Sequence, residues 1–349
     1  MTNNMGLLSF FSKNKSNAWV NCRVSNVKNL SRDFKVFSLM PKEENKPLVF
    51  IPGQYITIEQ TIQGEVLRRS YSICGEHQNG IQIGVKKISN GRMSTFLHDE
   101  IVEGSELKVH VPEGNFTLGA EKKVCAFVAG SGITPLASMI QSYQSNINLR
   151  VFFSVRKKED VLFSDLLNQT HATVYLSQEE ASGFKTGRLT YEALVDEIKT
   201  DLSLLQSDVF LLCGPNGFMD EIERCLRFFG VDEGKIKREF FIPPTPKEAV
   251  QPKKFSGTCE VVVTLDGQEK KLQIESGKKT LLEHFEEARI DPPYSCRGGV
   301  CSSCKAKINE GEVTMRQNYT LTDKEIAQGY VLTCQAEPVS NKIVISFDE

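Results

Sequence analysis

Four of the ten cysteines in this 349-residue chain crowd into its last fifth, and their spacing constrains the fold more than any other feature. Three follow the pattern C-x4-C-x2-C and the fourth comes after twenty-nine further residues: Cys296, Cys301, Cys304 and Cys334. Four thiolates at this spacing are the ligand set of a plant-type [2Fe–2S] cluster. Gly298 and Gly299 let the backbone approach the sulfides, so that its N–H groups can donate to sulfur. We therefore expect an iron–sulfur module at this end of the chain.

The alternatives to a cluster are a structural zinc site and four unrelated buried thiols. Zinc is usually bound by two C-x2-4-C pairs, and this sequence has only one such pair, so zinc is disfavoured. The other six cysteines are scattered singly and we find no export signal, so a disulfide framework is not expected. These observations favour a cluster in a cytoplasmic protein.

Charge and hydrophobic patterning exclude some classes of partner. The formal net charge is −2, so no excess of positive charge points to nucleic acid or to a membrane surface. The apolar run Gly6–Phe11 is too short for a spanning helix or for the core of a signal peptide. We expect a frayed tail over residues 1–16, no stable membrane insertion and no nucleic-acid partner.

Residues 17–120 are expected to form the first domain. Apolar and polar residues alternate in short runs such as 33–40 and 53–60, and one helical stretch, Met93–Val102, interrupts them. Several strands at this spacing predict an antiparallel β-barrel or sandwich.

A second pattern begins at residue 121 and ends at residue 242. Strand-like runs alternate with helical stretches there, which predicts a parallel, doubly wound sheet. Residues 243–256 are rich in proline and lysine and read as a semi-rigid linker. The last domain, 257–349, opens with a hairpin that turns at Asp266-Gly267, followed by a helix and the cysteine loop.

Two motifs in the barrel segment indicate a flavin site. Arg69-Ser-Tyr-Ser72 closes a strand, and Gly91-Arg-Met-Ser94 opens the helical stretch. An arginine and the free N–H groups of a helix start can together hold a flavin phosphate or pyrophosphate. Tyr71 offers an aromatic face for the isoalloxazine, and the Ser72 hydroxyl can reach flavin N5. Taken alone, the first motif is explained equally well by an ordinary strand with a surface arginine.

Two motifs in the α/β segment indicate a dinucleotide site. Gly130-Ser-Gly-Ile-Thr-Pro135 lies between a continuous apolar strand and a helix, so its glycines permit a pyrophosphate to approach the helix N-terminus. Cys213-Gly-Pro215 ends a later strand, where open sheets bind their ligands. By itself, the second motif is explained as well by a buried cysteine before a helix.

In this order and spacing, R-x-Y-S, G-R-M-S, G-S-G-I-T-P and C-G-P resemble the ferredoxin–NADP reductase superfamily. Residues 257–349 resemble a plant-type ferredoxin. The whole of 18–349 resembles the branch in which the reductase precedes the ferredoxin, that of multicomponent oxygenase reductases of the phenylacetyl-CoA epoxidase type. The resemblance implies a multidomain fold with an antiparallel β-barrel flavin domain, a doubly wound α/β nucleotide-binding domain and an α+β (β-grasp) ferredoxin domain. It also implies FAD rather than FMN.

The resemblance assigns roles to the matching residues. Those that would bind the flavin are Arg69, Tyr71, Ser72, Gly91, Met93, Ser94 and Phe241. Those that would place the nicotinamide nucleotide are Gly130, Gly132, Thr134, Pro135, Cys213, Gly214 and Pro215. The residues that would lie at the reacting atoms are Ser72, Cys213 and Glu239. For Glu239 and Phe241, which belong to a very short motif, a plain strand end is nearly as good an explanation.

We expect the nucleotide to be NADPH. The 2′-phosphate of NADPH requires arginine or lysine, and the sequence offers such residues at the expected place. Arg156 ends the strand after the glycine turn, beside Lys157 and Lys158, and Arg188 matches a second phosphate-binding arginine of NADPH-using relatives. A third family position holds Gln178 rather than arginine, which weakens the site. If Arg156 and the lysines are only a solvated strand end, NADH is the alternative.

These observations predict an NAD(P)H-dependent reductase that passes electrons through a flavin to a [2Fe–2S] cluster and on to a protein acceptor such as an oxygenase component. The alternatives are a reductase for a hydroxylase, acyl desaturase or hybrid-cluster protein, or a free-standing diaphorase. A redox sensor is disfavoured because the sequence has no basic recognition helix. A self-contained oxygenase is disfavoured because the five histidines are too dispersed for a 2-His-1-carboxylate iron site.

Overall fold

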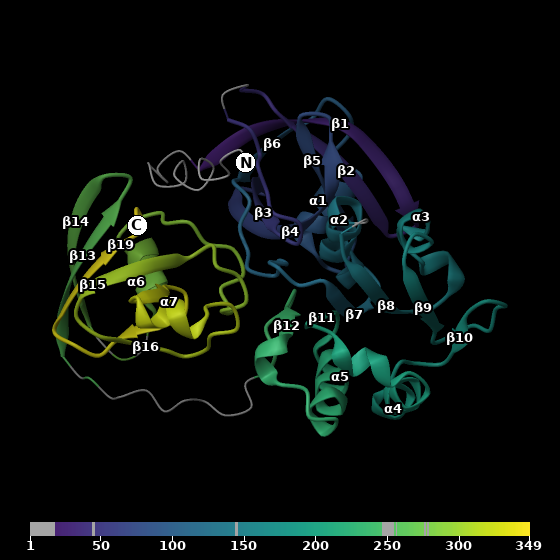
Figure 1. The fold of residues 1–349 in the computed structure, drawn as a ribbon. Helices are drawn as coiled ribbons and strands as arrows, with labels where there is room; N and C mark the ends of the chain where they lie inside the picture. The colour runs from purple at the N-terminus through teal and green to yellow at the C-terminus, as the bar shows by residue number, and fades with distance from the viewer. Residues whose placement is uncertain are drawn as a thin grey trace, which may run out of the picture. The chain divides into compact units, whose positions relative to one another are not determined.

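The computed structural model describes residues 18–43, 46–143, 146–245, 255, 257–275, 277 and 279–349 (Figure 1). The chain divides into two compact units, one from Val20 to Pro244 and the other built mainly from the segment Thr245–Glu349. The predicted tail 1–16 and most of the predicted linker 243–256 lie outside the described residues.

A closed six-stranded barrel forms the first part of the unit Val20–Pro244 (Figure 1). Its strands pair antiparallel in the order β1-β2-β5-β4-β3-β6, and their bounds are β1 Trp19–Ser31, β2 Phe34–Pro41, β3 Tyr55–Ile62, β4 Glu65–His77, β5 Gly80–Lys86 and β6 Glu106–His110. Alternate side chains turn inward, and Phe37, Ile58 and Ile73 are fully buried in the barrel core. Helix α1, Arg92–Asp99, packs against β3 and β5.

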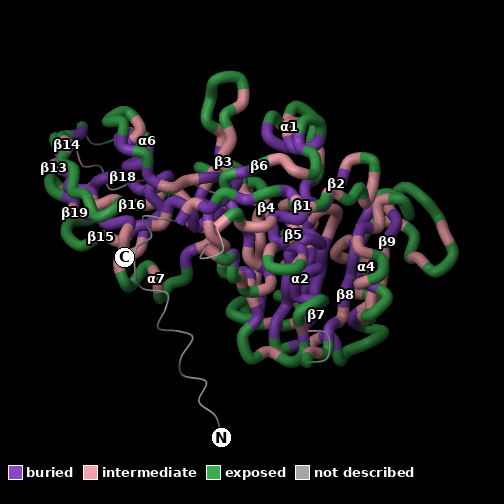
Figure 2. Tube along the Cα trace, turned by 90° about the horizontal axis from the view of Figure 1, so that it is seen from above, coloured by how far each residue is buried: buried purple, intermediate pink, exposed green. Residues whose placement is uncertain are grey.

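A six-stranded parallel sheet forms the second part of this unit, in the order β10-β9-β8-β7-β11-β12. Its strands are β7 Lys123–Ala129, β8 Asn148–Val155, β9 His171–Leu176, β10 Lys185–Thr186, β11 Val209–Cys213 and β12 Ile236–Glu239, and its α-helices are α2 Ile133–Tyr143, α3 Ser164–Leu167, α4 Tyr191–Thr200 and α5 Asn216–Phe228. Strand β7 is a continuous apolar run because it is covered on both faces: Val124 and Val128 belong to one core, and Cys125 and Phe127 to the other. Figure 2 shows β7 and β8 as mostly buried strands.

The barrel and the parallel sheet share one hydrophobic core. Phe34 and Phe116 of the barrel segment pack in the same cluster as Ile133 and Met139 of α2. Helix α2 also lies against β4. These contacts join the barrel and the sheet into one compact unit.

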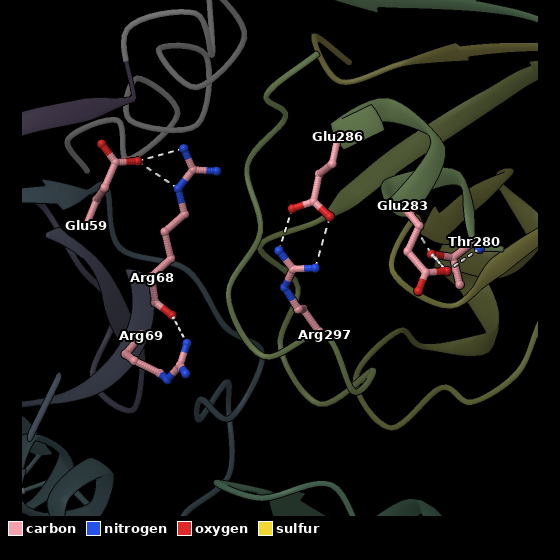
Figure 3. Close-up of polar contacts among 7 residues, drawn as sticks. All are labelled: Glu59, Arg68, Arg69, Thr280, Glu283, Glu286 and Arg297. Carbon is pink, nitrogen blue, oxygen red and sulfur yellow. Dashed lines mark hydrogen bonds and ion pairs between the residues drawn. The ribbon is translucent and has the colours of Figure 1, made fainter. Parts of the chain in front are cut away.

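The unit from Thr245 onward contains a five-stranded sheet of order β14-β13-β19-β15-β17 and a small two-stranded sheet of β16 and β18. Its elements are β13 Thr258–Leu265, β14 Gln268–Glu275, α6 Leu281–Glu287, β15 Lys305–Glu310, β16 Val313–Met315, α7 Asp323–Ala327, β17 Tyr330–Leu332, β18 Ala336–Pro338 and β19 Lys342–Ser346. The first hairpin turns at Asp266 and Gly267, whose φ angles of 57° and 70° suit a tight two-residue turn. Thr280 and Glu283 form a capping box that fixes the start of α6 (Figure 3).

Candidate functional site

Arg68 and Arg69 are neighbours on β4 with different partners (Figure 3). Arg68 is buried, and its Nε donates to Glu59 Oε2 at 2.7 Å. Burial alone would raise the pKa of Glu59, but hydrogen bonds from Lys108 and Arg68 lower it, so this pair stays charged. Arg69 is exposed, its Nη1 donates to the Arg68 carbonyl at 2.7 Å, and it has no ion pair among the residues that the structure describes. Arg69 therefore keeps N–H donors for an anionic ligand, whereas Arg68 stabilises the barrel.

Tyr71 and Ser72 follow Arg69 on β4. Tyr71 is half-buried, and burial raises the pKa of its phenol, so the ring stays neutral. Ser72 is buried and lies opposite Tyr55 in the pairing of β3 with β4. The strand thus presents an arginine, an aromatic ring and a hydroxyl in succession.

The start of α1 requires glycine at position 91. A β-carbon on Gly91 would lie 2.4 Å from Ile88 Cγ1 and 2.5 Å from Ser94 Oγ. The Ser94 hydroxyl donates to the Gly91 carbonyl at 3.1 Å and accepts from the Ile88 N–H at 3.3 Å. Met93 is buried in the barrel core. Within the described part of the chain no side chain caps this helix, so its first N–H groups are available to an anion.

A cleft of about 860 Å³ lies within the unit Val20–Pro244, over the carboxyl ends of β7, β8 and β11. The predicted residues that line it are Gly130, Gly132, Arg156, Arg188, Gly214, Pro215 and Phe241. Its volume suits a dinucleotide-sized ligand, and its place is where open parallel sheets bind ligands. Thr134, Pro135 and Cys213 are buried rather than part of the lining. The predicted flavin residues of the barrel also lie outside the lining.

The floor of the cleft depends on close backbone packing at Gly132. A β-carbon there would lie 2.1 Å from the Cys213 carbonyl oxygen, so any larger residue would push the glycine turn away from the end of β11. Gly130 has a φ of 54°, in the left-handed region that favours glycine. The Cys213 side chain is fully buried, and burial raises the pKa of its thiol well above the usual value. Cys213 therefore packs its backbone carbonyl against Gly132 and carries a neutral thiol.

Glu239 lies opposite Cys213 in the pairing of β11 with β12. Its side chain keeps partial contact with solvent, yet burial raises its pKa to about 8. Two residues later, Phe241 is 43% exposed and lines the cleft.

Two arginines lie exposed at the same cleft. Neither Arg156 nor Arg188 has a side-chain ion pair or hydrogen bond among the residues that the structure describes. The nearby carboxylate of Asp160 accepts a hydrogen bond from the Lys157 N–H at 3.2 Å. Gln178, the third family position, does not line the cleft. The cleft thus offers two guanidinium groups to an anion.

Several residues of this cleft were not predicted from the sequence. They include Asp33, Phe34 and Lys86 from the barrel, and Ser154, Ser177, Asn216, Gly217 and Glu221 from the α/β part. Ser154 and Ser177 lie at the carboxyl ends of neighbouring strands, a position that could have signalled them. The barrel residues had no such signal, because only the tertiary structure brings them to the sheet.

Four of the five cysteines of the C-terminal unit converge: Cys296, Cys301, Cys304 and Cys334. Cys301 Sγ lies 3.1 Å from Cys296 Sγ, and the Gly298 N–H donates to Cys296 Sγ at 3.4 Å. Contact with Cys301 lowers the pKa of the Cys296 thiol, and contact with the Cys296 sulfur raises the pKa values of Cys301 and Cys334 well above the usual range. Thiols this crowded cannot all become thiolates unless positive charge lies between them.

This arrangement fits a cluster better than a single ion. Within the described residues, no three or more His, Cys, Asp or Glu side chains, these four cysteines included, are grouped as the ligands of one metal ion. The sulfur-only donor set, the backbone N–H groups aimed at sulfur and the burial of Cys301, Cys304 and Cys334 are what a [2Fe–2S] cluster requires. Arg297, in this loop, forms a two-pronged ion pair with Glu286 of α6 (Figure 3).

Within the described ranges, no helix has the length and apolar composition needed to cross a bilayer.

Comparison with known proteins gives the same three domains. Residues 21–118 match the oxidoreductase FAD-binding domain, residues 127–224 the oxidoreductase NAD-binding domain, and residues 263–339 the 2Fe-2S iron-sulfur cluster binding domain. The fold and the site therefore define an NAD(P)H-dependent oxidoreductase that uses FAD and a [2Fe–2S] cluster.

Full-length relatives place the chain in its family. One subunit of the 1,2-phenylacetyl-CoA epoxidase of Escherichia coli (strain K12) is 32% identical over 343 residues, covering 93% of this chain and 96% of the relative. The glycine betaine monooxygenase reductase of Chromohalobacter salexigens is 30% identical over 378 residues, covering 97% and 99%. The chain belongs to the ferredoxin–NADP reductase superfamily, in the branch with a C-terminal plant-type ferredoxin domain. The predictions of the family, of the fold class, and of FAD, a [2Fe–2S] cluster and a nicotinamide nucleotide as cofactors are confirmed.

Solved structures agree on the fold. Phthalate dioxygenase reductase matches with a TM-score of 0.58 at 22% identity, covering 94% of this chain and 98% of that one. An intact type IV self-sufficient cytochrome P450 monooxygenase matches with a TM-score of 0.71 at 21% identity, covering 94% of this chain and 41% of that one.

Proposed function

We propose that this protein is the NADPH-oxidising reductase component of a multicomponent oxygenase of the phenylacetyl-CoA epoxidase type. The observation that carries the proposal is the cleft where the glycine turn, the C-G-P strand end and the exposed Arg156 and Arg188 meet. The relatives described above support it, because a component of an epoxidase and the reductase of a monooxygenase align with almost the whole chain. An acyl desaturase, another hydroxylase or hybrid-cluster protein as acceptor is the alternative.

The barrel would hold FAD. The free N–H groups of Arg69 and of the α1 start at Gly91 would bind its phosphates, with Ser94 and Met93 fixing that turn. Tyr71 and Ser72 would lie against the isoalloxazine, and Phe241 would pack beside it. When bound, FAD accepts an electron pair from a nicotinamide and releases electrons singly to a [2Fe–2S] cluster.

The glycine turn would position the nucleotide. Gly130 and Gly132 would admit the pyrophosphate, Thr134 and Pro135 would fix the first turn of α2, and the C-G-P segment Cys213–Pro215 would support the nicotinamide. Ser72, Cys213 and Glu239 would lie nearest the reacting atoms. Below pH 8 Glu239 is largely protonated, so it can offer a hydrogen bond without adding charge.

Arg156 and Arg188 would select NADPH over NADH. Both guanidinium groups are exposed at the cleft, and each can form a charge-assisted bond to the 2′-phosphate. Of the carboxylates at the cleft, Asp160 accepts a hydrogen bond from the Lys157 N–H at 3.2 Å.

Cys296, Cys301, Cys304 and Cys334 would hold the cluster through which electrons leave. We place the domain limits at 17–120, 121–242 and 257–349, with 1–16 as a tail and 243–256 as a linker. We also propose a cytoplasmic location, because the six cysteines outside the proposed ligand set are unpaired thiols, the state expected in a reducing compartment.

The proposal is tested by reconstitution. The loaded protein is mixed with purified oxygenase components of the phenylacetyl-CoA epoxidase type and with an acyl-CoA substrate, and NADPH oxidation and product formation are measured together. The proposal expects one component to accelerate NADPH oxidation and to form product only when this protein is present. If no component accelerates NADPH oxidation while cytochrome c is reduced rapidly, the protein is a free-standing diaphorase.

A further inference from the structure

The residue after the fourth cysteine makes an unusual set of contacts. Gln335 is only 7% exposed, and its Nε2 donates toward the Arg297 carbonyl at 2.8 Å and the Cys334 carbonyl at 2.9 Å. The same nitrogen lies 3.6 Å from Cys334 Sγ, within hydrogen-bond range for sulfur, so its two N–H groups are shared among three acceptors. One buried amide thus reaches the three-cysteine loop and the fourth cysteine together.

The loop is shaped to receive this amide. Arg297 has a φ of 54°, in the left-handed region. A β-carbon on Gly299, whose φ is 75°, would lie 3.2 Å from Gln335 Cγ and 3.0 Å from the Gln317 carbonyl oxygen. The Arg316 N–H donates to the Gln335 carbonyl at 2.9 Å and so fixes the backbone of Gln335 as well. Gln335 therefore ties a strained loop to the turn between β17 and β18 that carries Cys334.

The contact with sulfur has an electrostatic consequence. An N–H group aimed at a ligand sulfur favours the oxidation state with more negative charge, which for a [2Fe–2S] cluster is the reduced state. The donor is buried, so water screens this interaction little.

We propose that Gln335 is a positioning residue that holds the cysteine loop against Cys334 and raises the reduction potential of the cluster. The inference rests on the proposed ligand set, since it requires Cys334 to be a ligand. Its chemistry involves no bond change at Gln335: the side chain supplies two N–H donors and nothing else.

The test compares reduction potentials in the loaded full chain. Gln335→Met keeps the length of the side chain and removes its donors, and Gln335→Glu keeps the shape and replaces the donors with a carboxylate. Gln273→Met is the matched control, because Gln273 is exposed on β14. Iron and sulfide content are measured first, and the cluster is then titrated with dithionite under anaerobic conditions and followed by electron paramagnetic resonance.

We expect Gln335→Met to make reduction of the cluster about tenfold less favourable, which corresponds to ~59 mV for one electron. Gln335→Glu should lower the potential further, while Gln273→Met and the flavin potential of every variant stay at the wild-type values. Loss of iron from Gln335→Met alone would support the role of Gln335 in holding the cysteine loop against Cys334. The reduction potential of the cluster would then be measured in Gln335→Glu. Wild-type potentials in both Gln335 variants would overturn the inference. A wild-type protein without iron and sulfide would instead refute the cluster ligands, and so separates the two claims.

Discussion

The backbone N–H of Gly53 donates a hydrogen bond to the hydroxyl of Ser138, 2.9 Å away and 85 residues later in the chain. This bond joins the barrel to helix α2, and both groups are buried. A β-carbon on Gly84 of β5 would lie 2.5 Å from Thr134 Cγ2, so the start of α2 packs closely against the barrel at this glycine. The barrel and the nucleotide sheet therefore form one structural body.

The division into two units predicts that the cluster can be lost without the flavin. The core shared by the barrel and the parallel sheet predicts that the flavin unit unfolds as one. Cys301→Ser should remove the cluster while one FAD per chain is retained, because Cys301 belongs to the other compact unit. The flavin unit should still unfold in one transition, since its two parts share a core. Iron analysis, flavin absorbance and calorimetry measure this. Simultaneous loss of FAD and iron would contradict separate units.

Gly132→Ala should damage nucleotide binding and leave flavin binding intact. Its β-carbon would meet the Cys213 carbonyl oxygen at 2.1 Å, and the resulting shift costs about 1–3 kcal/mol. We expect the KM for the nucleotide to rise about tenfold or more. The control is Gly217→Ala, because Gly217 lines the same cleft and its added β-carbon would meet nothing within 4 Å. Equal effects of the two substitutions would refute this role for Gly132.

The raised pKa of Glu239 predicts that the stability and the activity of the protein depend on pH. Burial raises its folded-state pKa from 4.5 to about 8, so the folded protein binds this proton more tightly than the unfolded chain does. Stability should therefore fall as the pH rises from about 4.5 to about 8, and NADPH–ferricyanide activity should fall as the pH passes 8. Glu239→Gln, which stays neutral, should remove both trends. A wild-type pH profile in Glu239→Gln would exclude this carboxyl as the titrating group.

Arg156→Ala should change the choice of nucleotide. A charge-assisted contact contributes about 1.5–3 kcal/mol, so the KM for NADPH should rise roughly tenfold or more while that for NADH changes little. Lys157→Ala is the control, because Lys157 is exposed beside Arg156 but does not line the cleft. Steady-state kinetics with both nucleotides decide the matter. A wild type that prefers NADH, or a mutant that loses both equally, would contradict the assignment of Arg156.

Local patterns predicted most of the architecture. The alternation in β2 and β3, the apolar run of β7 and the turn at Asp266-Gly267 each gave an element of the right kind, because period and turn chemistry are local properties. The predicted helix Met93–Val102 is wrong at its end. Helix α1 stops at Asp99, because the following chain turns back and the Gly104 N–H bonds to β1.

Long-range partners could not be predicted in this way. The approach of Lys86 to the nucleotide cleft and the reach of Gln335 to Arg297 both join positions distant in sequence. The sequence motifs identify the glycines and cysteines of these sites, because those residues lie close together in the chain. They do not identify the side chains that distant segments contribute to the same sites.

Anaerobic reduction by NADPH tests the central claim most directly. NADPH is added to the loaded protein without any acceptor, flavin bleaching is followed by absorbance, and the reduced cluster is counted by electron paramagnetic resonance. The account predicts a bleached flavin and a reduced-cluster signal approaching one spin per chain, with Cys301→Ser bleaching normally and giving no such signal. A wild-type flavin that bleaches fully while the cluster stays oxidised would show that electrons do not leave through the cluster.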